Sequence, residues 1–138
     1  MKRLYLDTNI ALDYLLERLP FITAARQLFA VAQQGQAELL LSSLSFTTVH
    51  YVASKSSDKA DALTGVAQLF DLVTVVAVDR QVIGQAIQAG LPDCEDAVQL
   101  FAALGAQADV IVTRDPKGFG QSLIAVADPV AALHQLLS

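Results

Sequence analysis

The chain has 138 residues, the length of one ordinary domain and enough to bury a core without disulfides or structural metal. Hydrophobic residues make up 54% and charged residues 17%, which favours strands buried on both faces, and the formal net charge of −5 argues against nucleic-acid binding through a broadly basic surface. Cys94 is the only cysteine, which excludes a disulfide framework and a cysteine-rich zinc site and favours a reducing compartment.

Short apolar segments rich in Val, Ile and Leu alternate along the chain with longer segments of helical periodicity. In chain order, the strand-like segments are 3–7, 38–42, 73–78, 109–113 and 123–127. The helical segments are 10–17, 23–34, 46–54, 59–70, 81–90, 96–105 and 129–137. This alternation predicts right-handed crossovers and an α/β fold in three layers, with a central parallel sheet of about five strands and helices on both faces.

Glycine and proline mark the ends of several predicted helices. Gly35, Gly90 and Gly105 each follow a helical segment, and Asp128-Pro129 has the residues that open one. The sequence contains no internal repeat and no linker rich in Pro, Gly or Ser. We therefore expect residues 1–138 to form a single domain.

The apolar runs are too short for a membrane span. Asp7 interrupts the first of them before it reaches the length of a secretory signal, and the others are broken well before the roughly 18 residues that a span needs. A soluble, cytoplasmic protein without membrane association is expected.

Acidic residues stand at the ends of segments that should meet at one edge of the sheet. Asp7 ends the first strand, Asp115 follows the fourth, and Asp93, Glu95 and Asp96 lie where a helix begins. Ligands of parallel α/β sheets bind beyond the carboxyl ends of the strands. Each acid alone has the ordinary explanation of a helix cap or a turn. Together they predict a shared site for Mg²⁺ or Mn²⁺, which prefer oxygen ligands, and without these five acids the formal charge is zero.

Three short motifs surround the acids: Leu6-Asp7-Thr8-Asn9, Glu95-Asp96-Ala97 and Thr113-Arg114-Asp115. In their order and spacing they resemble the PIN domain family, and in particular bacterial PIN proteins of the VapC kind, many of which are toxins of toxin–antitoxin pairs. The resemblance covers essentially the whole chain. It implies a PIN-like fold and a Mg²⁺- or Mn²⁺-dependent endoribonuclease, with RNA as substrate, a small antitoxin as a possible partner and a homodimer as the assembly.

The same resemblance assigns roles to individual residues. Asp7, Asp96 and Asp115 would be the catalytic, metal-binding acids, with Glu95 and Asp93 as further candidates. Supporting roles fall to Thr8 or Asn9, which would hydrogen-bond Asp7, to Thr113, which would brace Asp115, and to Thr48.

One position departs from the family pattern. The helix after the second strand usually carries a glutamate, and Thr48 occupies that place here. The loss leaves an alternative from a different functional class: a catalytically weakened PIN domain that binds RNA or a protein.

Basic residues near the acids are candidates for RNA contact. Arg114 and Lys117 flank Asp115, and Arg18 and Arg26 come from the first helical segments, although solvated charge explains such residues more often. A like-charged pair, Asp13 and Glu17, would join the site if its helix leans over it, but an exposed helix face is the favoured expectation.

Other chemistry is less well supported. His50 could contact phosphate but is more often a structural residue, His134 is expected in solvent, and Cys94 has no basic neighbour to activate it. The two histidines lack the spacing of a zinc site. A phosphatase of the haloacid-dehalogenase type would need an acid where Asn9 stands, and a phosphoryl receiver would need an aspartate and a lysine that are missing.

Overall fold

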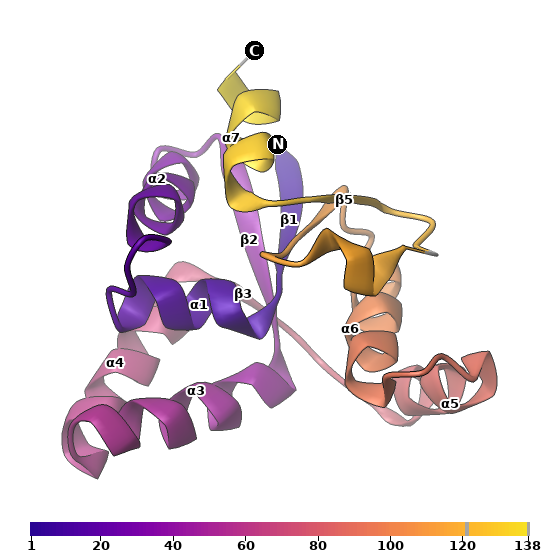
Figure 1. Cartoon of the computed structure of the whole chain (residues 1–138), viewed down its shortest axis with the longest axis horizontal. Helices are drawn as coiled ribbons and strands as arrows, with labels where there is room; N and C mark the ends of the chain where they lie inside the picture. The colour runs from indigo at the N-terminus through magenta and orange to yellow at the C-terminus, as the bar shows by residue number, and fades with distance from the viewer. Residues whose placement is uncertain (121, 138) are drawn as a thin grey trace.

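A five-stranded parallel sheet runs through the middle of the molecule (Figure 1). The structure is a computed structural model that describes residues 1–120 and 122–137. The strands are β1 (Lys2–Leu6), β2 (Ala37–Ser42), β3 (Thr74–Val76), β4 (Val110–Val112) and β5 (Ala125–Ala127). Their order is β3-β2-β1-β4-β5, and Leu6 at the end of β1 lies opposite Leu41 of β2 and Val112 of β4. The strand order therefore reverses direction at β1, where α/β proteins place their ligands.

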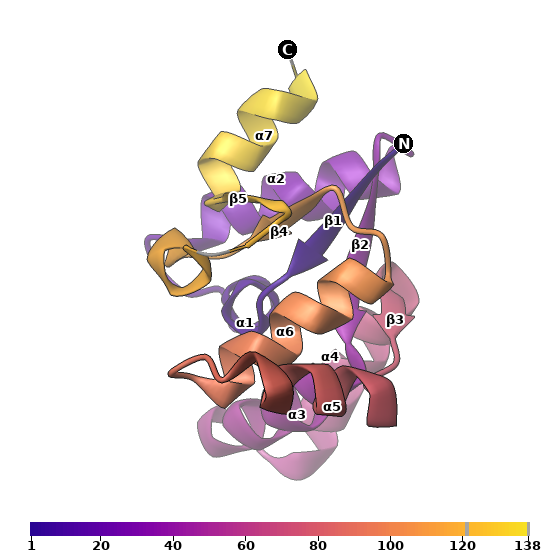
Figure 2. The ribbon, with the colours of Figure 1, turned by 90° about the vertical axis from the view of Figure 1, so that its right-hand side faces the viewer.

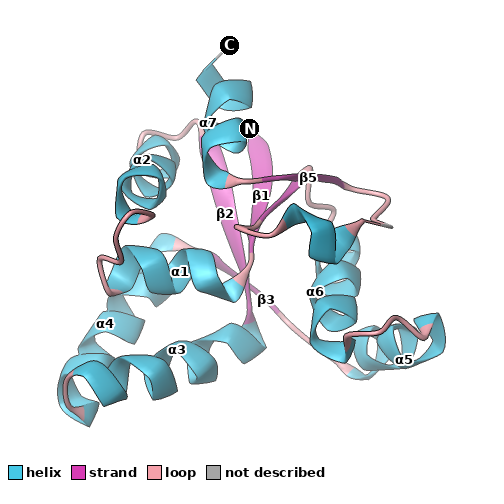
Figure 3. Ribbon diagram, viewed as in Figure 1, coloured by secondary structure: helices cyan, strands magenta, loops and turns pink. Residues whose placement is uncertain are grey.

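Helices cover both faces of the sheet, as Figures 2 and 3 show. On one side lie α1 (Thr8–Leu15), α2 (Ile22–Gln33), α3 (Ser43–Ser56), α4 (Lys59–Leu72) and α7 (Pro129–Leu137). On the other lie α5 (Arg80–Ala89) and α6 (Cys94–Gly105). The chain winds outward from β1 to β3 and then back to β4, so right-handed crossovers place the two groups of helices on opposite faces. Of the described helices, none is long and apolar enough to cross a membrane.

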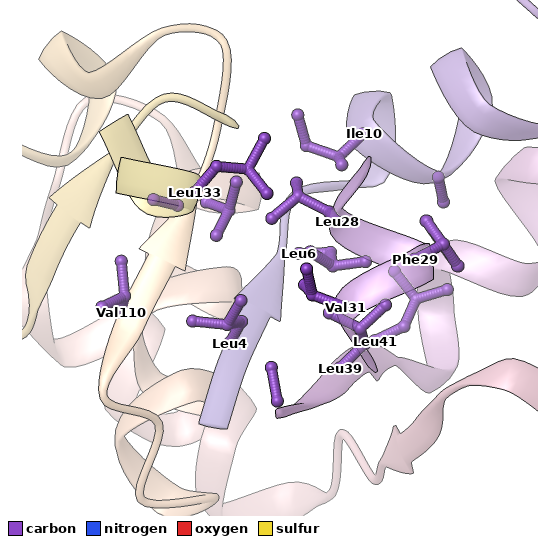
Figure 4. Packing of buried hydrophobic residues seen from close by; sticks show 14 of the residues in the cluster. Leu4, Leu6, Ile10, Leu28, Phe29, Val31, Leu39, Leu41, Val110 and Leu133 are labelled. Atoms are coloured by element: carbon purple, nitrogen blue, oxygen red, sulfur yellow. The ribbon is translucent and has the colours of Figure 1, made fainter. Parts of the chain in front are cut away.

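Two apolar clusters hold the layers together because successive residues of a strand face opposite sides. Leu4 and Leu6 of β1 pack with Leu39 and Leu41 of β2 against α1, α2 and α7 (Figure 4). Tyr5 lies in the other cluster, with residues of α5 and α6. The strands are therefore apolar on both faces, which explains the continuous hydrophobic runs in the sequence.

The expected three-layer α/β architecture is confirmed, and the differences are local. Gly90 has the left-handed backbone (φ 62°) expected of a residue that ends a helix. Gly105 does not, because it is the last residue of α6, and Gln107 (φ 58°) makes the left-handed turn instead. A short 3₁₀ helix, η1 (Pro116–Phe119), was not predicted, since four residues are too few to show a period.

Candidate functional site

Asp7 and Thr113 form the centre of the site, at the carboxyl ends of the adjacent strands β1 and β4. The Thr113 hydroxyl donates a hydrogen bond to Asp7 Oδ2 (2.8 Å) and accepts one from the backbone N–H of Asp115 (3.2 Å). Thr113 is 1% exposed, so its rotamer is fixed by packing. A single buried hydroxyl thus holds the first acid and the backbone of the last one.

The expected support of Asp7 by Thr8 or Asn9 takes a specific form. Asp7 is the N-terminal cap of α1, and its Oδ1 accepts a hydrogen bond from the backbone N–H of Thr8 (2.8 Å). The Thr8 hydroxyl is 2.7 Å from the hydroxyl of Ser45, a buried residue of α3 that is not among the predicted site residues. The amide oxygen of Asn9 lies 3.5 Å from Nη1 of Arg18.

Asp96 comes from the first turn of α6, on the opposite face of the sheet. Asp93 is the N-terminal cap of this helix, and its Oδ1 accepts a hydrogen bond from the backbone N–H of Asp96 (3.1 Å). Further along, the hydroxyl of Tyr5 donates to Oε1 of Gln99, and both residues are buried. Since Tyr5 is two residues before Asp7 and Gln99 is three after Asp96, this bond fixes the helix with Asp96 against the strand with Asp7.

The carboxylates act on one another electrostatically. Partial burial raises the pKa of Asp96 above its usual value, and the negative charges of four other acids raise it further: Asp93, Asp7, Glu95 and Asp115. Asp96 is half-buried, whereas Glu95 and Asp115 are exposed. The five acids expected from the sequence therefore lie close enough together for the charges of four of them to act on Asp96.

The donor set suits a hydrated cation rather than an enclosed one. In the part of the chain that the structure describes, no group of three or more Asp, Glu, His or Cys side chains is arranged to hold a metal ion. Mg²⁺ usually keeps several waters and takes one or two carboxylates together with substrate phosphate. Carboxylates that repel one another at the edge of a cleft fit that mode of binding.

A pocket of about 420 Å³ opens beside Asp96. Asp93 and Lys117 line it together with apolar side chains such as Leu91 and Leu100. Gly118 of η1 approaches the acid so closely that a Cβ at this position would lie 3.2 Å from Oδ2 of Asp96. The close approach of η1 is a feature that the sequence alone did not reveal.

The position of the missing glutamate contributes no charge. Thr48 is exposed on α3, and its hydroxyl lies 3.5 Å from the carbonyl oxygen of Leu44 in its own helix. His50, on the same helix, is half-buried, and His134 is exposed on α7 as expected. Cys94 is exposed at the start of α6.

The expectation for Asp13 is wrong. Its side chain is 1% exposed, and it pairs with Nε of Arg114 (3.0 Å) and Nη1 of Arg18 (3.7 Å). Burial raises the pKa of the Asp13 carboxyl, while the charges of Arg114 and Arg18 lower it. Glu17 is exposed, but it lies beyond the end of α1 with a left-handed backbone (φ 53°), and its Oε1 is 3.3 Å from Nη2 of Arg26. The helical period predicted a solvent face for Asp13. It could not reveal the pairing, because Arg114 comes from a loop about a hundred residues further along the chain.

Comparison with known proteins places the chain in a family. A family model described as a PIN domain matches residues 3–117. A DNA-bound VapBC structure from Salmonella typhimurium matches with a TM-score of 0.71 at 20% identity, over 94% of this chain and 99% of that one. VapBC-1 from nontypeable Haemophilus influenzae gives 0.68 at 19% identity, over 93% and 98%.

A third structure is VapC20 from Mycobacterium tuberculosis, described as a toxin that cleaves the sarcin–ricin loop. It matches with a TM-score of 0.67 at 12% identity, over 86% of this chain and 94% of that one. No curated protein sequence matches significantly. The structural likenesses show a shared fold, and the family model covers well over half of the sequence: the chain belongs to the PIN domain family.

Proposed function

We propose that this protein is a Mg²⁺- or Mn²⁺-dependent endoribonuclease with Asp7, Asp96 and Asp115 as its catalytic acids. One observation carries the proposal: acids that follow two strands and open a helix come together at the switch point of the sheet, where burial and then the charges of its neighbours raise the pKa of Asp96. Such repulsion destabilises an empty site and is relieved by a cation. Glu95 and Asp93 lie close enough to contribute to the same field.

The residues of the chain prepare the site in distinct ways. Asp7 is held by a hydrogen bond at each carboxylate oxygen, from Thr8 N–H and from the Thr113 hydroxyl, so its orientation is set before any ligand arrives. A bound divalent ion would activate a water molecule and stabilise charge on the leaving oxygen of a phosphodiester. Lys117 lines the adjacent pocket, and we propose that its charge attracts the phosphate backbone.

We also propose that the nuclease is the toxin of a toxin–antitoxin pair. Several similar structures are VapBC complexes, and VapC20 is described as a toxin that cleaves the sarcin–ricin loop. A small antitoxin and a second copy of this chain are the partners proposed, and the cytoplasm is the proposed location. Coexpression with the product of a neighbouring short reading frame would test the pairing: relief of growth arrest supports it, and arrest unaffected by every such product contradicts it.

The test of the activity is RNA cleavage by purified protein in Mg²⁺, Mn²⁺ or EDTA. Asp7→Asn should abolish metal-dependent cutting, because it removes a charge while keeping the shape of the side chain. Asp71→Asn, the same exchange at an exposed position of α4, is the matched control and should cut like the wild type. Equal cutting by both variants would show a contaminating nuclease.

The second candidate is a PIN domain that binds RNA or a protein without cutting. It is favoured by one observation, that Thr48 supplies an exposed hydroxyl where a carboxylate is usual in the family. Thr48→Glu separates the two: if the wild type is inactive and the glutamate variant cuts RNA, the chain is a weakened member, whereas cutting by the wild type excludes the binding-only function.

A further inference from the structure

Two arginines converge on one buried carboxylate at the border of the acidic site. Asp13 on α1 is 99% buried, yet the described residues offer neither of its oxygens a hydrogen-bond donor in good geometry. It is held by charge, through Nε of Arg114 at 3.0 Å and Nη1 of Arg18 at 3.7 Å. The Arg114 guanidinium also lies over the ring of Phe21, 4.0 Å from its centre. Arg114 is therefore fixed from two sides.

This arrangement is a poor way to stabilise a fold. The cost of removing the aspartate from water and of partly dehydrating two guanidiniums is often as large as their mutual attraction, and an apolar residue in place of Asp13 would do as well or better. The imperfect hydrogen bonding of Asp13 adds to this cost. A role in placing the arginines accounts for the cluster better than a role in stability does.

The cluster borders the proposed catalytic acids. Arg114 is the residue before Asp115, and Nη1 of Arg18 also reaches the amide oxygen of Asn9 (3.5 Å), two residues after Asp7. Asp13 and Asn9 are four residues apart on α1 and so lie on the same side of the helix. Arg18 and Arg114 remain 32% and 27% exposed. Two cations on one anion leave an excess positive charge beside an acidic site.

We infer that Arg18 and Arg114, positioned by the buried Asp13, bind a phosphate of the RNA next to the one that is cut. The inference rests on the proposed function and extends it. The chain as a whole is acidic, and its phosphate-binding charge must be concentrated where the substrate lies. Guanidinium groups suit this purpose because their planar donors match phosphate oxygens. Asp13 is a positioning residue, since its oxygens are buried away from the substrate.

The test measures binding instead of cutting. Anisotropy of a labelled single-stranded RNA of mixed sequence would be followed in EDTA, from about 50 to 200 mM KCl. Arg18→Gln and Arg114→Gln should each weaken binding ~10-fold at the lowest salt and reduce the slope of log K against log [KCl] by about 1. Asp13→Asn keeps both cations, so it should weaken binding several-fold with the slope unchanged.

Arg80→Gln is the matched control. It removes the same charge from an exposed position at the start of α5, on the other face of the sheet from Asp13. If Arg18→Gln and Arg114→Gln bind RNA like Arg80→Gln while the wild type still cuts, the inference is overturned and the nuclease stands. If the wild type neither binds nor cuts RNA, both are overturned. Should Asp13→Asn fail to fold, the two arginine variants decide the question alone.

Discussion

Thr113→Val tests how the site is held together. The substitution keeps the shape of a side chain that is 1% exposed and removes its hydroxyl. Two hydrogen bonds are lost: the one to the charged Asp7 Oδ2, at 2.8 Å, and the one from the backbone N–H of Asp115, at 3.2 Å. A bond to a charged group contributes about 1.5–3 kcal/mol and a neutral one about 1 kcal/mol, so the free energy of unfolding should fall by about 2–4 kcal/mol.

Urea unfolding followed by circular dichroism measures this loss. In thermal unfolding, the Tm should fall by roughly 5–15 °C. Thr113→Ser is the control, because it keeps the hydroxyl and loses only a methyl group. Metal-dependent RNA cutting should decrease in Thr113→Val and largely survive in Thr113→Ser. If Thr113→Val is as stable as Thr113→Ser or more so, the hydroxyl does not hold Asp7 and Asp115 as described.

Three further outcomes are expected. Because the pKa of Asp96 is raised in the folded protein, ionisation of Asp96 opposes folding at pH values above its usual pKa of 3.8. Asp96→Asn should therefore raise the free energy of unfolding at pH 7 and lose this advantage as the pH falls below about 4. A constant advantage at all pH values contradicts this reasoning. Gly118→Ala should impair cutting because its Cβ would press on Asp96 Oδ2, whereas Gly84→Ala, in open space on α5, should raise stability by up to about 1 kcal/mol and leave cutting unchanged. Tyr5→Phe should cost about 1–3 kcal/mol by leaving Gln99 unpaired, and Tyr5→Phe with Gln99→Met should recover most of it in urea unfolding; an unchanged deficit places the loss elsewhere.

Local patterns in the sequence were sufficient for the architecture. Strands such as β1 and β4 are continuous apolar runs because both of their faces are buried, and the acids that follow them are visible without knowledge of any contact. Asp7 and Asp115 follow adjacent strands, so the rule that parallel strands present their carboxyl ends together predicted their proximity.

Features that depend on distant pairs were not predictable in this way. Asp13 looks like a solvent residue on a helical wheel, and only the fold brings Arg114 to it. The hydroxyl of Thr113 was expected to serve Asp115, but the packing of β4 beside β1 turns it toward Asp7 as well. The turn after α6 falls on Gln107 rather than Gly105, because the helix continues through the glycine.

The position of β1 also governs when the site comes into being during synthesis. The strand is made first, but its second neighbour, Val110–Val112, follows only after two further strands and six helices. Until then one edge of β1 has no partner strand, and Thr113 has not reached Asp7. A nascent chain released before about this point would carry the first acid without its brace. Assembly of the candidate site is thereby delayed until most of the polypeptide has left the ribosome, a useful delay for the ribonuclease proposed above.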